Sequence, residues 1–281
     1  MIGRNWELED LATGRKARLA RFLTAMEVDA DNPAVARVLD GALASPKGTV
    51  VGLTGPPGVG KSSLTNALIP HLRAESARVA VIAIDPSSRS SGGALLGDRA
   101  RVEVDPGDEG VFIRSMAARD RLGGLSDLTY PTTIVMRALF DMVLVETVGV
   151  GQSESEIADC ADLIVLCVQP GAGDSLQFMK AGIMEIPDLV LVTKGDLGAP
   201  AIRAVSDIQG ALGLTNHRSI PPAVLKVSAQ TGEGVAETVS TLNRLCSTLD
   251  AEGLLTRERD RQARKERLWL RDLTALTAHD A

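Results

Sequence analysis

A glycine-rich stretch, residues 55–62 with the sequence GPPGVGKS, directly follows the apolar run of residues 49–54. It matches the phosphate-loop pattern G-x-x-x-x-G-K-[ST], whose glycine residues let backbone N–H groups curl around phosphate groups. In this pattern Lys61 supplies a positive charge to the β- and γ-phosphates, and Ser62 offers its hydroxyl to Mg²⁺. A helix that begins where the loop ends also points its positive N-terminus at the anion. The stretch therefore predicts a nucleotide site.

A second motif, Thr193-Lys-Gly-Asp196, follows the apolar run 188–192 and resembles the N/T-K-x-D motif of G proteins. By that resemblance, the Asp196 carboxylate accepts hydrogen bonds from the N1–H and the amino group of guanine, a pattern that adenine does not offer. The stem of Lys194 is expected to lie along the plane of the base. Thr193 replaces the commoner asparagine and has a shorter polar reach, so we expect weaker binding but retained discrimination.

A third motif, Ser228-Ala-Gln-Thr231, resembles the S-A-K/L loop that supports guanine from its other edge. Each of these tetrapeptides is a weak signal alone, because each is also compatible with a turn that ends a strand. Their order and spacing after the phosphate loop together predict a GTP site. The predicted contacts to GTP are Gly55, Pro56, Pro57, Gly58, Val59, Gly60, Lys61, Ser62, Ser63, Lys194, Asp196, Ser228, Ala229 and Gln230.

Carboxylates that suit a magnesium ion follow two further apolar runs. Glu146-Thr-Val-Gly149 stands where G proteins carry D-x-x-G, so Glu146 is expected to hold Mg²⁺ directly or through water. The N–H of Gly149 is then expected to meet the γ-phosphate. Asp85 and Asp98 are further candidates, and capping of a helix is the alternative role for each. The predicted Mg²⁺ ligands are Ser62, Asp85, Asp98 and Glu146.

The residue that orients the attacking water is not evident from the sequence. Val150 follows Gly149, where many small G proteins carry a glutamine, so intrinsic turnover is expected to be slow. Gln152, Asp98 and Lys180 are candidates to complete the site. Three arginines, each either an arginine finger or a solvated surface residue, are Arg89, Arg99 and Arg101. The predicted catalytic set for hydrolysis of GTP to GDP and phosphate is Lys61, Asp98, Glu146, Gly149 and Gln152.

Short apolar runs alternate with helical patterns after the phosphate loop, which predicts repeated βαβ units. These runs are residues 78–85, 111–114, 141–148, 162–168, 188–193 and 223–228. An apolar content of 44% with only 2% aromatic residues indicates a core of Val, Ile, Leu and Ala, as in strands buried on both faces of a parallel sheet. We therefore predict an α/β fold of the P-loop NTPase class, with a mostly parallel central sheet flanked by helices.

Helical patterns lie on both sides of this region. Residues 6–28 and 33–43 predict helices before it, and residues 232–249 predict the last helix that covers the sheet. A charged helix is predicted over residues 256–277, and its basic part is either a partner surface or a solvated face. The predicted divisions are a helical N-terminal extension over residues 1–45, a P-loop GTPase domain over 46–250 and a C-terminal helix over 251–281.

Composition excludes several classes of function. The formal net charge is −6, whereas nucleic-acid binding needs a basic footprint, so no nucleic-acid partner is predicted. The apolar stretches are too short to span a bilayer and the start lacks the apolar region of a signal peptide, so we expect a cytoplasmic protein without a membrane partner. The three cysteines lack metal-binding spacing, and no disulfide framework is expected.

Several segments around these motifs resemble the MeaB/ArgK family of SIMIBI-class P-loop GTPases. They are residues 84–88, 91–93, 96–98, 145–153, 170–174 and 177–180, and the resemblance runs from about residue 6 to residue 249. It implies a G-protein chaperone that gates adenosylcobalamin loading and protects or reactivates a cobalamin-dependent acyl-CoA mutase, typically methylmalonyl-CoA mutase. It also implies a cobalamin adenosyltransferase and a second copy of the chain as partners. Family members usually continue into a longer helical dimerisation arm, relative to which residues 251–281 are short.

The resemblance further assigns three switch segments, residues 87–99, 148–156 and 171–180, and the third is expected to face the partner enzyme. In that third segment the matching positions are Asp174, Gln177 and Lys180. Two other functions remain compatible with a phosphate loop. One is an ATP-dependent kinase, which Asp196 argues against. The other is a metal-delivery GTPase of the same class, of the kind used for nickel enzymes.

Overall fold

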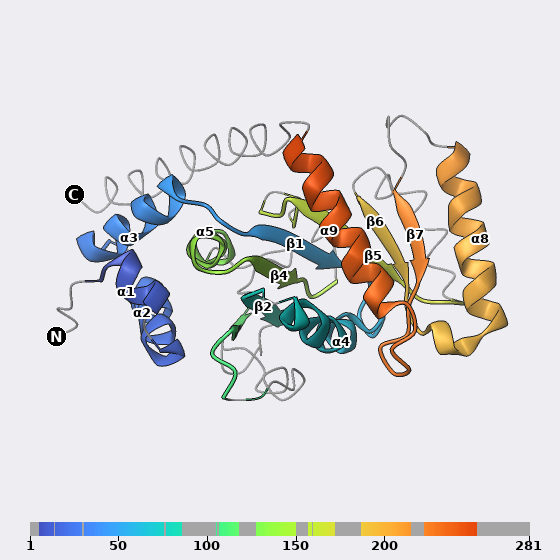
Figure 1. The fold of residues 1–281 in the computed structure, drawn as a ribbon, viewed down its shortest axis with the longest axis horizontal. Helices are drawn as coiled ribbons and strands as arrows, with labels where there is room; N and C mark the ends of the chain where they lie inside the picture. Colours follow the sequence, from blue (N-terminus) through green and yellow to red (C-terminus); the bar gives the residue numbers. More distant parts are fainter. Residues whose placement is uncertain are drawn as a thin grey trace.

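The computed structural model describes most of the chain, and the elements of the predicted α/β fold lie within the described part (Figure 1). The described residues are 6–13, 15–29, 31–75, 77–85, 105, 107–117, 128–149, 157–158, 160–171, 187–214 and 222–251. For residues 85, 214 and 249–251 the backbone alone is described. The predicted charged helix over residues 256–277 lies outside this part.

Within the described part of the chain, seven parallel strands form one sheet in the order β3-β2-β4-β1-β5-β6-β7. The strands are β1 (Thr49–Thr54), β2 (Val79–Asp85), β3 (Val111–Ala117), β4 (Met142–Glu146), β5 (Leu163–Val168), β6 (Leu189–Val192) and β7 (Ala223–Lys226). Each predicted apolar run contains a strand, and β3 continues three residues beyond its predicted end at Arg114. Every residue of β4, β5 and β6 is buried, as expected for strands covered on both faces.

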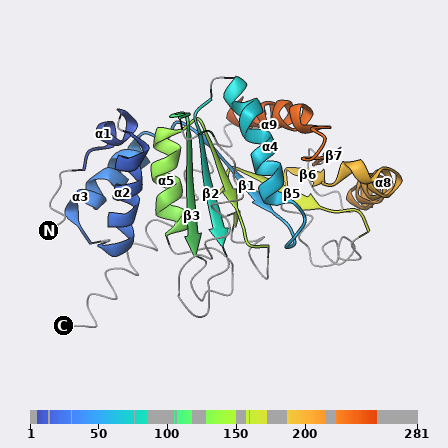
Figure 2. The ribbon, with the colours of Figure 1, turned by 90° about the horizontal axis from the view of Figure 1, so that it is seen from below.

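Helices cover both faces of the sheet, as Figures 1 and 2 show. Helix α4 (Lys61–Ala74) and helix α9 (Val235–Ala251) pack on one face through a cluster that includes Leu68, Val239 and Val165. On the opposite face lie α5 (Thr129–Leu139) and α8 (Ala199–Leu214), the latter preceded by the short 3₁₀ helix η2 (Gly195–Leu197). Among the described residues, no helix has the length and apolar character needed to cross a bilayer.

The N-terminal pattern predicted over residues 6–28 is two helices, α1 (Leu8–Thr13) and α2 (Lys16–Val28), followed by α3 (Pro33–Ala44). Arg15 adopts an extended conformation at the start of α2 and separates the first two. The ring of Trp6 packs edge-on against that of Phe22, with centroids 5.5 Å apart. Phe22 is fully buried in the cluster that also contains Met136 of α5. The N-terminal helices therefore share a hydrophobic core with one face of the sheet, and the division at residue 45 stays a prediction.

A bidentate ion pair at the far end of α4 anchors the turn that leads into β3. Arg73 donates to both carboxylate oxygens of Asp108, at 2.9 and 2.8 Å, and to the carbonyl of Ala77. The Asp108 carboxylate also accepts a hydrogen bond from the N–H of Gly110. Its pKa is held below the usual carboxyl value, chiefly because Arg73 hydrogen-bonds the charged form.

We expect Asp108→Asn to lower the free energy of unfolding at pH 7 by about 0.5–1 kcal/mol. Because the pKa of Asp108 is lowered in the folded state, its stabilisation is present above the ordinary carboxyl pKa of about 3.9 and is lost at lower pH. Urea unfolding of the wild type and the variant at pH 7 and pH 3 measures this. Asp207→Asn, at an exposed position of α8, is the control. If the wild type and the variant differed in free energy of unfolding by the same amount at both pH values, the stabilisation assigned to the charged Asp108 would be contradicted.

Candidate nucleotide site

The phosphate loop lies at the carboxyl end of β1, the central strand, where the chain order of the strands reverses. Ligands of open α/β sheets bind at this kind of edge. Gly55 leaves β1 with a φ of 138°, and a Cβ built there would lie 2.2 Å from the carbonyl oxygen of Cys167. Only glycine fits this close approach of two backbones. Burial raises the pKa of the Cys167 thiol to about 12, so this side chain stays neutral and packs as a small hydrophobic group.

Lys61 begins α4 and is buried beneath the loop, with 6% of its surface exposed. Its ammonium donates hydrogen bonds to the carbonyl oxygens of Gly55, at 2.8 Å, and Pro56, at 3.1 Å. Gly60 caps the helix in a left-handed conformation that a residue with a Cβ rarely adopts. The loop therefore holds a cation at the start of a helix, and this is the arrangement that a phosphate chain requires.

Two of the four predicted Mg²⁺ ligands are in contact. Ser62 donates its hydroxyl to Glu146 Oε1 at 2.6 Å, although the two residues are 84 positions apart in the sequence. Glu146 closes β4 and is in register with Leu53 of β1 and Ala83 of β2. Asp85 ends β2 at the same edge of the sheet, but its side chain lies outside the described residues. A hydroxyl and a carboxylate are hard oxygen donors, so this pair fits a magnesium ion.

Gly149 lies directly against the phosphate loop. Its φ is 81°, and a Cβ built there would be 2.0 Å from the carbonyl oxygen of Gly55 and 2.8 Å from Lys61 Nζ. The main chain after β4 thus approaches the loop at the position of the lysine ammonium. This is where the sequence predicts that the γ-phosphate is recognised.

We expect Gly149→Ala to lower GTP turnover by about 100-fold or more. The new methyl group would displace the Gly55 carbonyl or the lysine, and a displacement of about 1 Å near the reacting groups costs on the order of 100-fold. A single-turnover phosphate-release assay measures this. Gly213→Ala in α8 is the matched control, because a Cβ there has no atom within 4 Å. Turnover within about threefold of the wild type would show that Gly149 does not need its close approach.

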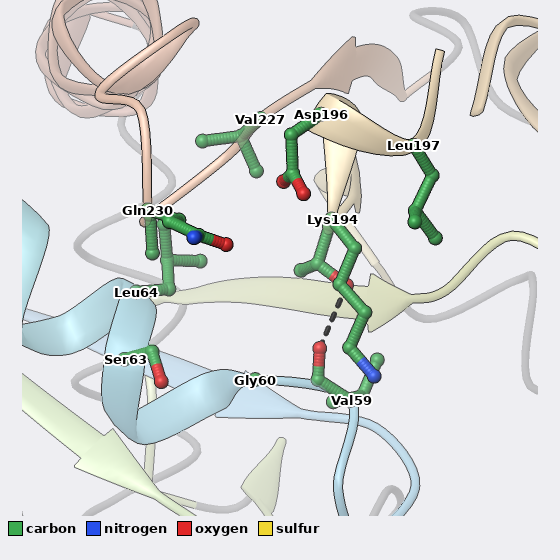
Figure 3. A pocket seen from close by; sticks show the side chains of 11 residues that line it. Val59, Gly60, Ser63, Leu64, Lys194, Asp196, Leu197, Val227 and Gln230 are labelled. Atoms are coloured by element: carbon green, nitrogen blue, oxygen red, sulfur yellow. Dashed lines mark hydrogen bonds between the residues drawn. The ribbon is translucent and has the colours of Figure 1, made fainter. Parts of the chain in front are cut away.

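A pocket of about 270 Å³ opens between the phosphate loop and the ends of β6 and β7 (Figure 3). Its lining consists of Val59, Gly60, Ser63, Leu64, Thr193, Lys194, Asp196, Leu197, Val227, Ala229 and Gln230. Small-molecule sites usually exceed roughly 300 Å³, so this volume suits a base rather than a whole nucleotide. The three sequence motifs therefore meet around one space, with Lys194, Asp196 and Gln230 at its rim.

Asp196 is held in place by the third motif. Ser228 is fully buried and donates its hydroxyl to Asp196 Oδ1 at 2.6 Å. The N–H of Gly195 donates to the carbonyl of Val227 at 2.9 Å. The residues that line the pocket do not include Ser228, and its direct contact to GTP stays a prediction. Its contacts assign it the positioning of the carboxylate that is predicted to select guanine.

Thr193 connects the base-recognition motif with the phosphate loop. Its hydroxyl is 2.7 Å from the carbonyl of Val59 and 3.0 Å from that of Val168, and it can donate to one of them at a time. The sequence predicted only that Thr193 has a shorter polar reach than asparagine. It did not predict the hydrogen bond to Val59, which is 134 residues away in the sequence. The shorter side chain therefore reaches the phosphate loop itself. Whether guanine binding is weaker than with asparagine stays a prediction.

Several predicted site residues lie outside the described residues. They are Asp98, Val150, Gln152, Asp174, Gln177, Lys180 and the arginines Arg89, Arg99 and Arg101. The same is true of residues 87–99 and of most of the other two predicted switch segments. Their catalytic, metal-binding and partner roles stay predictions.

The predicted GTP contacts did not include three apolar residues of the pocket, Leu64, Leu197 and Val227. Leu197 directly follows Asp196, lines the pocket and is 52% exposed. Its position next to Asp196 in the sequence was the signal that could have predicted it as a pocket residue. Leu64 and Val227 also belong to the hydrophobic core, and their second role at the pocket is evident only in the folded chain.

Comparisons with known proteins agree with this site. Residues 19–279 match the family model described as "Methylmalonyl Co-A mutase-associated GTPase MeaB". A Pyrococcus horikoshii protein, provisionally named a GTPase, is 39% identical over 266 residues, which cover 92% of this chain and 83% of that protein. The mouse protein named methylmalonic aciduria type A homolog, mitochondrial, is 40% identical over 228 residues, which cover 79% of this chain and 54% of the mouse protein. The chain thus matches about half of that mouse protein.

Solved structures confirm the fold. A crystal structure described as that of a LAO/AO transport system kinase superposes with a TM-score of 0.73 at 29% identity, and the match covers 97% of this chain and 83% of that one. The hydrogenase maturation factor HypB of Archaeoglobus fulgidus has a TM-score of 0.53 at 17% identity, with 82% of this chain and 98% of that one covered, and it shows the fold alone. The family match decides for a guanine-nucleotide hydrolase over an ATP-dependent kinase. The chain belongs to the MeaB family of P-loop GTPases.

Proposed function

We propose that this GTPase gates the loading of adenosylcobalamin into a cobalamin-dependent acyl-CoA mutase of the methylmalonyl-CoA mutase type, and that it protects or reactivates the mutase. The supporting observation is the family match over residues 19–279, because that family is described by its association with this mutase. The name of the mouse relative is consistent with it. A cobalamin adenosyltransferase and a second copy of the chain as further partners, and a cytoplasmic location, belong to the same proposal.

Hydrolysis in this proposal depends on charge neutralisation and positioning. The Lys61 ammonium and the loop N–H groups bind the phosphate oxygens, and the N–H of Gly149 meets the γ-phosphate. Ser62 and Glu146 would hold a magnesium ion, which would supply positive charge to stabilise the negative charge that develops during hydrolysis. Asp85 and Asp98 are proposed to complete its ligands. Gln152 is proposed to help order the attacking water.

We expect Glu146→Gln to raise the Mg²⁺ concentration needed for half-maximal GTP hydrolysis by about tenfold or more. The amide keeps the shape of the side chain but lacks the negative charge that favours a divalent cation. A magnesium titration of GTP turnover measures the change. Glu237→Gln, at an exposed position of α9, controls for the loss of one carboxylate. An unchanged titration midpoint would exclude Glu146 from the metal site.

The nucleotide state can alter a partner only if the partner contacts the GTP-bound and GDP-bound forms differently. The proposal therefore predicts that a complex with the mutase depends on which nucleotide is bound. It also predicts that the rate at which cobalamin enters the mutase changes when GTP is hydrolysed.

The test is a binding and transfer experiment with purified proteins. The chain, loaded with GDP or with a non-hydrolysable GTP analogue, is mixed with methylmalonyl-CoA mutase and analysed by size-exclusion chromatography. Cobalamin transfer is then followed by absorbance. Ethylmalonyl- and isobutyryl-CoA mutases serve as alternative partners. Nucleotide-dependent binding of one mutase supports the proposal, and absence of binding to all three in every nucleotide state would refute it.

A further inference from the structure

The base-recognition motif is attached to the carboxyl end of β5 by two consecutive residues. The N–H of Thr193 donates to the carbonyl of Val168 at 2.8 Å, and the Thr193 hydroxyl lies within reach of the same oxygen. Gln169 follows Val168 in the chain. Its Oε1 accepts a hydrogen bond from the ammonium of Lys194 at 2.5 Å. Gln169 belongs to none of the three nucleotide-binding motifs, although it lies at the same edge of the sheet.

Lys194 has an unusual backbone that the surrounding structure maintains. Its φ is 55°, and among the described residues it is the only residue other than glycine with a positive φ. Such a conformation is rare outside glycine and concentrates at functional sites. The hydrogen bond from Gly195 to Val227 holds the next peptide in place. The backbone thus directs the stem of Lys194 along the wall of the base pocket (Figure 3).

A lysine side chain has four rotatable bonds and loses much conformational freedom when it is fixed against a ligand. The bond to Gln169 holds the exposed end of this side chain before any base enters the pocket. Lys194 therefore loses part of its conformational entropy already when the protein folds, and less is lost when a base binds. Preorganisation usually increases affinity in this way.

We propose that Gln169 is a positioning residue of the guanine-nucleotide site, which holds Lys194 against the face of the base and slows nucleotide release. This inference rests on the guanine site and is independent of the mutase partner. Gln169 acts through Lys194, so it is expected to influence the face of the base and not the edge that Asp196 is predicted to recognise.

We expect Gln169→Ala to speed the release of a fluorescent GDP analogue by about three- to tenfold, as for the loss of one hydrogen bond. Steady-state hydrolysis should show a raised KM for GTP with kcat unchanged, because the phosphate loop is intact. Inosine diphosphate lacks the exocyclic amino group, so its affinity relative to GDP reports the edge contact of Asp196. The variant should weaken both nucleotides by the same factor.

Two further variants separate positioning from general damage to the fold. Gln169→Glu retains an acceptor for the lysine ammonium and adds a charge, so release should stay within about twofold of the wild type or become slower. Gln209→Ala removes an exposed glutamine from α8 and should change nothing. Thermal unfolding of each variant, with and without GDP, shows whether the fold itself has changed.

The inference is overturned if Gln169→Ala releases GDP at the wild-type rate, or if Gln169→Glu releases GDP as fast as the alanine variant. It is also overturned if Gln169→Ala lowers kcat for GTP hydrolysis while KM is unchanged. A change in the ratio of GDP to inosine diphosphate affinity would also overturn it, because it would place the effect at the base edge. Failure of the wild type to bind GDP would instead refute the guanine site itself. Failure of the mutase experiment leaves these measurements unaffected.

Discussion

Replacement of Lys61 by alanine is expected to reduce GTP hydrolysis by at least about 100-fold, the scale seen when one preorganised donor to a developing charge is removed. The ammonium is buried and held by the carbonyls of Gly55 and Pro56, so water cannot easily replace it. Phosphoryl transfer depends on such fixed positive charge more than on covalent chemistry. Single-turnover phosphate release, measured at saturating GTP and Mg²⁺, tests the prediction.

The same variant should fold. Lys61 contacts loop carbonyls at the edge of the sheet, whereas the core consists of apolar clusters on its two faces. Circular dichroism and thermal unfolding should therefore resemble those of the wild type. Lys47→Ala, at an exposed position before β1, is the matched loss of one lysine. Near wild-type turnover by Lys61→Ala would refute the role assigned to the phosphate loop.

The second large effect is a change of base specificity. Asp196→Asn should weaken GTP binding by about 100-fold and shift preference toward xanthosine triphosphate. Hydrogen bonds to a charged group contribute roughly 1.5–3 kcal/mol each; asparagine replaces one carboxylate acceptor with an N–H₂ donor that faces the guanine amino group, and its remaining oxygen carries no charge. Xanthine carries a carbonyl where guanine has its amino group, so the new amide N–H₂ finds an acceptor. Because Ser228 donates to Asp196 Oδ1, its hydroxyl can hold the amide oxygen in the same place.

Competition between GTP, xanthosine triphosphate and ATP for a fluorescent nucleotide measures this change. Asp207→Asn in α8 controls for the loss of one carboxylate. Equal binding of ATP and GTP by the wild type would contradict the guanine assignment before any variant is made. A variant that loses GTP without gaining xanthosine triphosphate would place Asp196 away from the base edge.

Much of the fold follows from local patterns. The apolar runs of β1, β4, β5 and β6 have a length and composition that suit strands buried on both faces, and each was predicted within a few residues. The helical pattern over residues 6–28 did not reveal that two helices form there, because helical spacing of apolar residues persists across the extended Arg15. Hydrophobic periodicity reports which face is buried and does not report where the helix is interrupted.

The site was predictable where one motif supplies both residue and geometry, as at Lys61 and Gly55. It was less predictable where a residue acts by holding another side chain in place. The hydroxyl of Ser228 donates to Asp196 from a fully buried position, a contact that the motif itself did not predict, and its direct contact to GTP stays a prediction. Gln169 belongs to no motif, and its contact with Lys194 depends on the pairing of β5 with β6.

The sequence by itself determined the chemistry of this protein, because a phosphate loop and a guanine-recognition motif need particular residue types at short, local spacings. The tertiary structure alone decided which distant residues meet. Ser62 meets Glu146 across 84 residues, and Thr193 meets Val59 across 134, because parallel strands in register bring their carboxyl ends to one edge of the sheet. Contacts between such distant residues arise from strand order and register, which no single stretch of sequence encodes.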